Sequence, residues 1–302
     1  MTTTAMNRWR RARTDLPTIV KEALGLIHLL LRRSTDAKAV YDILSAHNNL
    51  GDRTLYLNMG YWRGATSYDQ ACEALALLLA ERARLAAGQT VLDAGFGFGD
   101  QDILWARRFG VRIVGFNITA SQVSAARDRV REAGLALDVD LKCRSVLHTG
   151  LADSSVDRVV ALESAFHLSS RDAFFAEARR VLRPGGRIAL ADLCAVANPS
   201  TRLFDRVNAW VAQRMWQIPA CNHYDAREYA ARLEAAGFVD VTVERITDDV
   251  FLPFGAYARR HQSDPDIAAR ANPLLRAVWR APATDRVFDY VLVTGRRPEA
   301  TA

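Results

Sequence analysis

The segment from residue 90 to residue 105 constrains the fold more than any other part of the chain. A short apolar run, Thr90 to Ala94, leads into the glycine-rich loop Gly95–Gly99, and helical periodicity follows as far as Trp105. Glycines let a backbone approach a ligand closely, and a helix N-terminus behind them favours negative charge. A strand, a glycine loop and a helix in this order begin a βαβ unit, so we expect an α/β fold with a ligand site at the loop.

The rest of the chain keeps alternating short β-branched runs with helical periodicity, which is typical of a parallel sheet covered by helices. Further strands are expected at 111–116, 137–143, 158–162, 188–192, 239–246 and 287–294. Further helices are expected at 120–133, 171–182 and 224–237. The helix at 171–182 is expected to stop at Arg183-Pro184-Gly185-Gly186, a sequence typical of a tight turn.

A chain of 302 residues suits two domains or one elaborated α/β domain. We divide it into four parts. Residues 1–37 form an N-terminal helical arm, and residues 38–194 form the ligand-binding Rossmann-like core with an aromatic lid segment. Residues 195–224 form a helical insertion that serves as a lid. Residues 225–302 complete the core sheet, with a second helical insertion at 251–282.

Composition excludes several classes of function. The net charge of +6 comes from scattered arginines, and without a Lys/Arg run interleaved with aromatics we expect no nucleic-acid partner. The four cysteines are far apart and form no CxxC pair, which indicates neither a metal site nor a disulfide framework and fits the cytoplasm. Lys21 and Glu22 interrupt the apolar stretch near the N-terminus, so we expect neither a secretory signal nor a membrane span.

The N-terminal arm carries an apolar stripe at helical spacing that must be buried somewhere. Its own domain and a second copy of the chain are the two expected partners, which makes a homo-oligomer through this helix one reading. A membrane surface is the third surface against which the stripe could pack. The stripe consists of Ile19, Val20, Ala23, Leu24, Ile27, Leu30 and Leu31.

The spacing of the glycine loop points away from dinucleotides. The pattern is GxGxG, whereas dinucleotide-binding strands are followed by GxGxxG. Asp93 closes the preceding strand, and an acid in that place suits a ligand with an amino group better than a pyrophosphate. A nicotinamide-dependent oxidoreductase is therefore the second-ranked enzyme class.

Several motifs in a fixed order resemble class I S-adenosylmethionine (SAM)-dependent methyltransferases. The general likeness rests on 91–99 and 181–186. A narrower likeness, to the natural-product branch that contains the erythromycin-pathway sugar O-methyltransferase, rests on 56–62, 101–105 and 162–167. The resemblance implies a seven-stranded, mostly parallel sheet with an antiparallel edge. SAM would lie across the carboxyl ends of the first strands and leave as S-adenosylhomocysteine, with no metal required.

The resemblance also implies a set of cofactor-binding residues. The three glycines would wrap the methionine part, and Asp93 would orient the loop. Asn117 stands where many relatives have an acid for the ribose; it would bind the ribose together with Gln122, or serve only as a turn residue. The segment after the third strand would contact the adenine. The aromatic segment before the first strand would form a lid over the cofactor. The expected cofactor residues are Asp93, Gly95, Gly97, Gly99, Asn117, Gln122, Ser145, Val146, Tyr56 and Tyr61.

Three polar residues at strand ends are the expected catalytic residues, because active sites of open α/β sheets form at that edge. They are Glu163, His167 and Asp192. A neutral histidine accepts a hydroxyl proton at pH 7, and an aspartate orients the imidazole. The resemblance gives these two roles to His167 and Asp192, and His223 is a second candidate base.

The sequence thus predicts a methyltransferase acting on a bulky, partly apolar small molecule of secondary metabolism. O-methylation of a hydroxyl suits the His/Asp pair best. C- or N-methylation of an indole alkaloid or isoprenoid-type compound is the alternative, and a carbon acceptor with a cationic intermediate would make more use of Glu163. A non-catalytic SAM-binding scaffold is the remaining reading.

Overall fold

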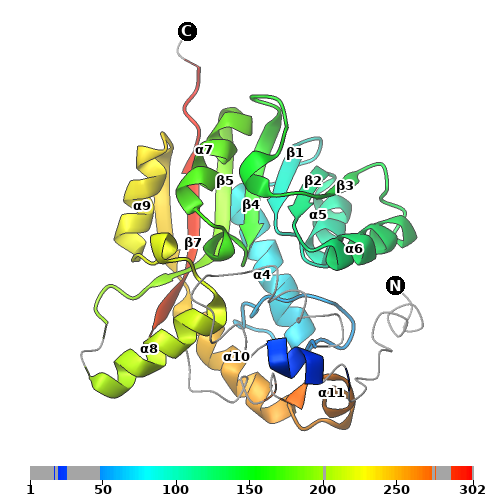
Figure 1. Ribbon diagram of the computed structural model, residues 1–302. Helices are drawn as coiled ribbons and strands as arrows, with labels where there is room; N and C mark the ends of the chain where they lie inside the picture. The colour runs from blue at the N-terminus through cyan, green and yellow to red at the C-terminus, as the bar shows by residue number, and fades with distance from the viewer. Residues whose placement is uncertain are drawn as a thin grey trace.

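A seven-stranded sheet forms the centre of the molecule (Figure 1). The computed structural model describes residues 17, 20–25, 48–199, 202–273, 276 and 287–300. The strands are β1 (Thr90–Ala94), β2 (Arg112–Asn117), β3 (Val139–Cys143), β4 (Val156–Leu162), β5 (Leu182–Ala195), β6 (Val239–Arg245) and β7 (Phe288–Arg296). Their order is β3-β2-β1-β4-β5-β7-β6, which confirms the predicted fold class. The antiparallel strand β7 lies between β5 and β6 rather than at the edge.

Helices cover both faces of the sheet. One buried apolar cluster joins one face to α4 (Tyr68–Ala83), α5 (Asp100–Phe109), α6 (Ala120–Glu132) and α10 (Thr247–His261). The other face packs against α7 (Arg171–Val181) and α9 (Ala226–Ala235). Side chains alternate between the two faces along each strand, so neighbouring residues of β5 belong to different clusters. Because of this alternation, side chains at strand ends can meet only when they project from the same face of the sheet.

A second layer of helices lies below the carboxyl ends of the parallel strands (Figure 1). It contains α8 (Leu203–Trp216), α10 and α11 (Pro265–Arg270). The described helical residues of the N-terminal arm lie beside α11, where Glu22 accepts hydrogen bonds from Asn48 (3.2 Å) and Asn272 (2.8 Å). This region has the helical character expected for the insertions, although α10 already begins at Thr247, directly after β6.

The apolar stripe of the N-terminal arm is not buried where the structure describes it. Val20 and Leu24 are 48% and 61% exposed, whereas the polar Glu22 is buried. Glu22 is buried because two asparagine side chains satisfy its carboxylate. Most of the stripe lies outside the described residues, including Ile19, Ile27, Leu30 and Leu31.

The largest difference from the expected elements concerns β5. It begins at Leu182 rather than Ile188, so the segment expected as a tight turn belongs to the strand. Leu182 of β5 pairs with Val156 of β4, and the next pair is Arg187 with Arg158. Four residues of β5 thus stand opposite a single residue of β4. Residues 183–186 therefore bulge out of the pairing with β4, and the amide of Gly185 bonds Arg297 instead (3.0 Å).

Candidate active site

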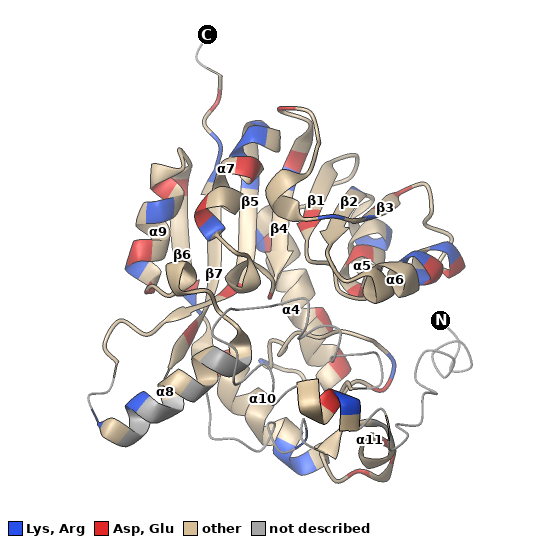
Figure 2. Cartoon of the chain, in the orientation of Figure 1, with Lys and Arg blue, Asp and Glu red and all other residues tan. Residues whose placement is uncertain are grey.

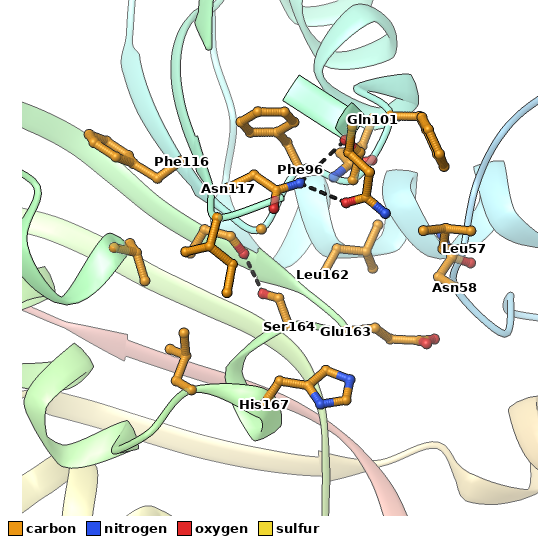
Figure 3. A pocket seen from close by; sticks show the side chains of 18 of the residues that line it. Leu57, Asn58, Phe96, Gln101, Phe116, Asn117, Leu162, Glu163, Ser164 and His167 are labelled. Atoms are coloured by element: carbon orange, nitrogen blue, oxygen red, sulfur yellow. Dashed lines mark hydrogen bonds between the residues drawn. The ribbon is translucent and has the colours of Figure 1, made fainter. Parts of the chain in front are cut away.

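A cavity of about 300 Å³ opens at the carboxyl ends of β1, β2 and β4. Its walls are the glycine loop, the end of β2, the turn after β3, residues 55–58 and residues 162–169. Figure 3 shows His167 and Glu163 on one side of this cavity and Asn117 and Gln101 across from them. The edge of the sheet is the one predicted, and the volume is in the range of small-molecule sites.

The glycine loop presents bare backbone to the cavity. Gly97 has φ +55°, and the nearest atom to a Cβ added there is on Leu57, 3.9 Å away, so its face is open. Gly95 has φ +90°, and a Cβ there would lie 2.4 Å from Cβ of Ser164. A side chain at Gly95 would therefore push apart the loop and the end of β4, and one at Gly97 would occupy ligand space.

A buried ion pair holds the loop in place. Arg129 of α6 donates to both carboxylate oxygens of Asp100 at 2.6 Å and to the carbonyl of Phe98 at 2.5 Å. Asp100 also accepts from the amide of Leu55 (3.3 Å), which ties in the segment that covers the cavity. Local sequence gave no signal for this pair, because 29 residues separate its members.

The end of β2 provides the polar groups expected for a ribose. The amide nitrogen of Asn117 donates to Oε1 of Gln122 (2.9 Å), while its oxygen accepts from the backbone of Thr119 (3.1 Å). Both side chains line the cavity. The buried Nε2 of Gln122 has no hydrogen-bond partner among the described residues. A buried donor without a partner costs about 1–3 kcal/mol, so this atom fits a ligand oxygen.

Asp93 lies behind the loop rather than on the cavity wall. It is fully buried and accepts from Nε2 of Gln101 (3.0 Å), a residue that does line the cavity. Burial raises the pKa of Asp93 to about 7, and burial beside Asp93 raises that of Asp102. The charge of Asp93 further disfavours ionisation of Asp102, since neither carboxyl is exposed to water. Asp93 therefore positions Gln101 and the loop.

The remaining expected cofactor residues divide into two groups. Ser145, Val146 and Tyr56 line the cavity, and the Ser145 hydroxyl accepts from the amide of Leu147 (3.2 Å). Tyr61 and Gly99, contrary to expectation, do not line it; Gly99 is the N-cap of α5. The chain turns at Gly60, whose φ is +78°, and Tyr61 packs against the apolar core instead.

Glu163 adopts an unusual backbone conformation, φ +50°, directly after β4. Its Oε1 accepts from the amide of Met59 (2.7 Å) and from the hydroxyl of Tyr290 (2.8 Å). Because both donors use the same oxygen, the other is left for the cavity that this residue lines. Burial raises the pKa of Glu163 to about 7. Sequence reasoning missed Tyr290, since it lies on β7, far along the chain.

His167 ends the short 3₁₀ turn η2 (Ala165–His167) and lines the cavity. The imidazole is hydrogen-bonded to the backbone of Gln217, and its centroid lies 4.1 Å from that of the Phe166 ring. Burial lowers the pKa of His167 to about 3. The ring is therefore neutral at pH 7.

The contacts of Asp192 correct the expected pairing with His167. Its Oδ2 meets Nε of Arg171 (3.0 Å) and accepts from the Tyr229 hydroxyl (2.7 Å), all within the core. Alternation along β5 directs this side chain to the face covered by α7 and α9, where α7 begins with Arg171. Its Oδ1 accepts from the amide of Phe166 (3.0 Å). Asp192 thus holds the turn that carries His167 instead of touching the imidazole.

Other expectations concern absent features and the second histidine. His223 does not line the cavity; its Nε2 lies 2.7 Å from Nε2 of Gln213.

Among the described residues, no cluster of three or more potential metal ligands is found. Within the same residues, no helix is long and apolar enough to span a membrane. Figure 2 shows acidic and basic residues interspersed on the outer helices.

This strand order, with a glycine loop after the first strand and a cavity at the carboxyl edge, defines the class I methyltransferase fold. Residues 92–190 match the family described as "Methyltransferase domain". Erythromycin 3''-O-methyltransferase of Saccharopolyspora erythraea is 31% identical over 96% of this chain and 99% of its own. The 27-O-demethylrifamycin SV methyltransferase of Amycolatopsis mediterranei is 30% identical over 80% and 90%, respectively.

The chain therefore belongs to the SAM-dependent methyltransferases of secondary metabolism. A geranyl diphosphate methyltransferase solved in complex with SAM has the same fold, with a TM-score of 0.59 and 26% identity over 76% of this chain and 87% of that one. SAM is the cofactor, and the open Gly97 backbone and the unpartnered Gln122 amide fit it. The oxidoreductase reading is wrong.

Proposed function

We propose that this enzyme methylates a hydroxyl oxygen of a bulky, partly apolar natural product, with His167 as the general base. The observation that supports this most directly is a neutral imidazole on the cavity wall, across from Asn117, a predicted cofactor residue. One relative described above is named as a 3''-O-methyltransferase of erythromycin and the other as a methyltransferase of 27-O-demethylrifamycin SV, and both align over most of the chain.

The cofactor supplies an electrophilic sulfonium methyl group when it is bound. His167 accepts the proton that leaves the acceptor hydroxyl as the new C–O bond forms. Because the pKa of His167 is about 3, this transfer becomes favourable only once bonding to carbon has made the hydroxyl acidic. The free oxygen of Glu163 binds and orients the acceptor, while Met59 and Tyr290 fix the carboxyl group.

C-methylation is the second candidate, and the same Glu163 favours it. A buried carboxylate beside the cavity would stabilise a carbocation formed when a double bond is methylated. The two candidates differ in where the new methyl group sits on the product.

The test is methyl transfer to a panel of glycosylated macrolactones, ansamycins and isoprenoids, followed by mass spectrometry and NMR. We expect a gain of one CH₂ unit on an oxygen-bearing acceptor, with an O-methyl carbon signal. A methyl group on carbon would replace the first candidate by the second. Binding of SAM with no transfer to any acceptor would contradict both.

Replacing Gln122 by alanine is expected to weaken binding of S-adenosylhomocysteine about tenfold, because one hydrogen bond to the ribose is lost. Isothermal titration calorimetry measures this directly. The matched control is Gln89→Ala, just before β1 and away from the cavity, which should bind like the wild type. Unchanged affinity in Gln122→Ala would show that the amide does not bind the cofactor.

A further inference from the structure

Three arginines stand side by side across the sheet at the end opposite the cavity. Arg158 of β4 is in register with Arg187 of β5, and Arg187 is in register with Arg296 of β7. Residues paired in this way project from the same face of a sheet. Like charges directly opposite each other destabilise a sheet, so this arrangement needs an explanation.

The arginines lie on the face covered by α4. Val160 of β4, Ala189 of β5 and Tyr290 of β7 have the same parity as the arginines on their strands, and all three belong to the core cluster with α4. Helix α4 stops short of the arginines, and its C-cap is another arginine, Arg84. A cleft of about 560 Å³ remains at this point. It is lined by Glu81, Arg82, Arg84, Arg187, Asp240, Thr242, Thr294 and Arg296.

Carboxylates neutralise two of the arginines around the cleft. Arg82 pairs with Glu244 at 2.9 Å and with Glu81 at 3.1 Å. Arg296 pairs with Asp240 at 2.7 Å and with Glu299 at 3.9 Å.

The other three cations have no carboxylate within 4.0 Å in the part of the chain that the structure describes. Arg187 donates to the Thr294 hydroxyl (3.2 Å), and Arg158 donates to the carbonyls of Arg84 (3.3 Å) and Asp157 (2.8 Å). Arg84 is exposed at the rim. Burial and then the neighbouring Arg84 and Arg158 lower the pKa of Arg187, and Asp240 offsets them only in part. The neutral oxygens orient the guanidinium groups, and Asp157 and Asp240 offset the charges of Arg158 and Arg187 without pairing with them directly.

We propose that this cleft binds a small phosphate-bearing anion, held by Arg187 and Arg84. Guanidinium groups match phosphate oxygens in geometry. The hydroxyls of Thr242 and Thr294 also line the cleft; they hydrogen-bond each other (2.9 Å), which leaves one hydroxyl hydrogen to donate to a ligand. The cleft lies at the amino ends of β4 and β5, whereas the cofactor cavity lies at the carboxyl ends of the parallel strands. The bound anion would thus occupy a site separate from the methyl transfer.

Titration calorimetry with inorganic phosphate and with pyrophosphate, in low-salt buffer, tests the proposal on the full-length protein. We expect pyrophosphate to bind and to bind more weakly as NaCl is added. Arg187→Gln should weaken binding about tenfold, because a charge-assisted hydrogen bond is lost. Arg112→Gln, which removes an exposed arginine of β2, is the matched control and should bind pyrophosphate like the wild type.

The protein without pyrophosphate gives a second readout. Arg187→Gln removes the repulsion within the arginine row, so its Tm should rise by about 1–3 °C at low salt. A protein that merely lost a structural contact would instead become less stable. No binding of pyrophosphate at low salt, or equal binding by Arg187→Gln and the wild type, would overturn the proposal.

Discussion

Replacing His167 by alanine should lower kcat by about 10²–10⁴-fold, the usual contribution of a positioned general base. The imidazole lies on the cavity wall and is neutral at pH 7, so its loss removes the proton acceptor. Affinity for S-adenosylhomocysteine should hardly change, because Asn117, a predicted ribose-binding residue, lies across the cavity from His167. Steady-state kinetics and titration calorimetry on the same preparation separate the two effects.

The Glu163→Gln variant is the control for the His167→Ala experiment. Burial raises its pKa to about 7 while that of His167 falls to about 3, so a step in kcat/KM near pH 7 reports on Glu163 rather than on the histidine. The carboxylate form gains population as the pH rises, so the rate should rise through this step. Glu163→Gln should lose the step, and His167→Ala should keep it at a lower rate. A wild-type rate in His167→Ala would remove the histidine from the mechanism.

The pattern of strands and loops predicted the fold because each strand and helix is recognisable from the periodicity of its own residues. Alternating β-branched runs and helical periodicity specify a parallel sheet, and the glycine loop after β1 marks the ligand edge. The start of β5 was not predictable in the same way. Arg183-Pro184-Gly185-Gly186 suits a tight turn locally, but its backbone bonds that of Arg297, which follows β7 and lies more than a hundred residues away.

The cavity wall was predictable to the extent that chain order places residues at strand ends. Asn117, Gln122 and His167 reach the cavity as expected. The direction of a side chain is harder to foresee, because a shift of one residue along a strand changes the face. Asp192 is the clearest case: the strand was right, but it continues to Ala195, and the side chain enters the opposite layer, where Arg171 neutralises it.

Asp192→Asn is therefore expected to destabilise the fold by about 3–5 kcal/mol, the typical effect of removing one partner of a buried ion pair. The asparagine can still accept from the amide of Phe166, but it leaves the guanidinium of Arg171 without its counter-ion in the core. Urea unfolding of the variant and the wild type measures the change in the free energy of unfolding.

The double variant Arg171→Met/Asp192→Asn distinguishes a structural carboxylate from a catalytic one. With both charges removed no ion is left unpaired, so the double variant should be more stable than Asp192→Asn alone. Asp192 acts on His167 through the turn at Phe166, so activity should follow stability and recover in part in the double variant. If Asp192 served the imidazole directly, Asp192→Asn would keep its stability and lose its rate, and removing Arg171 would restore neither.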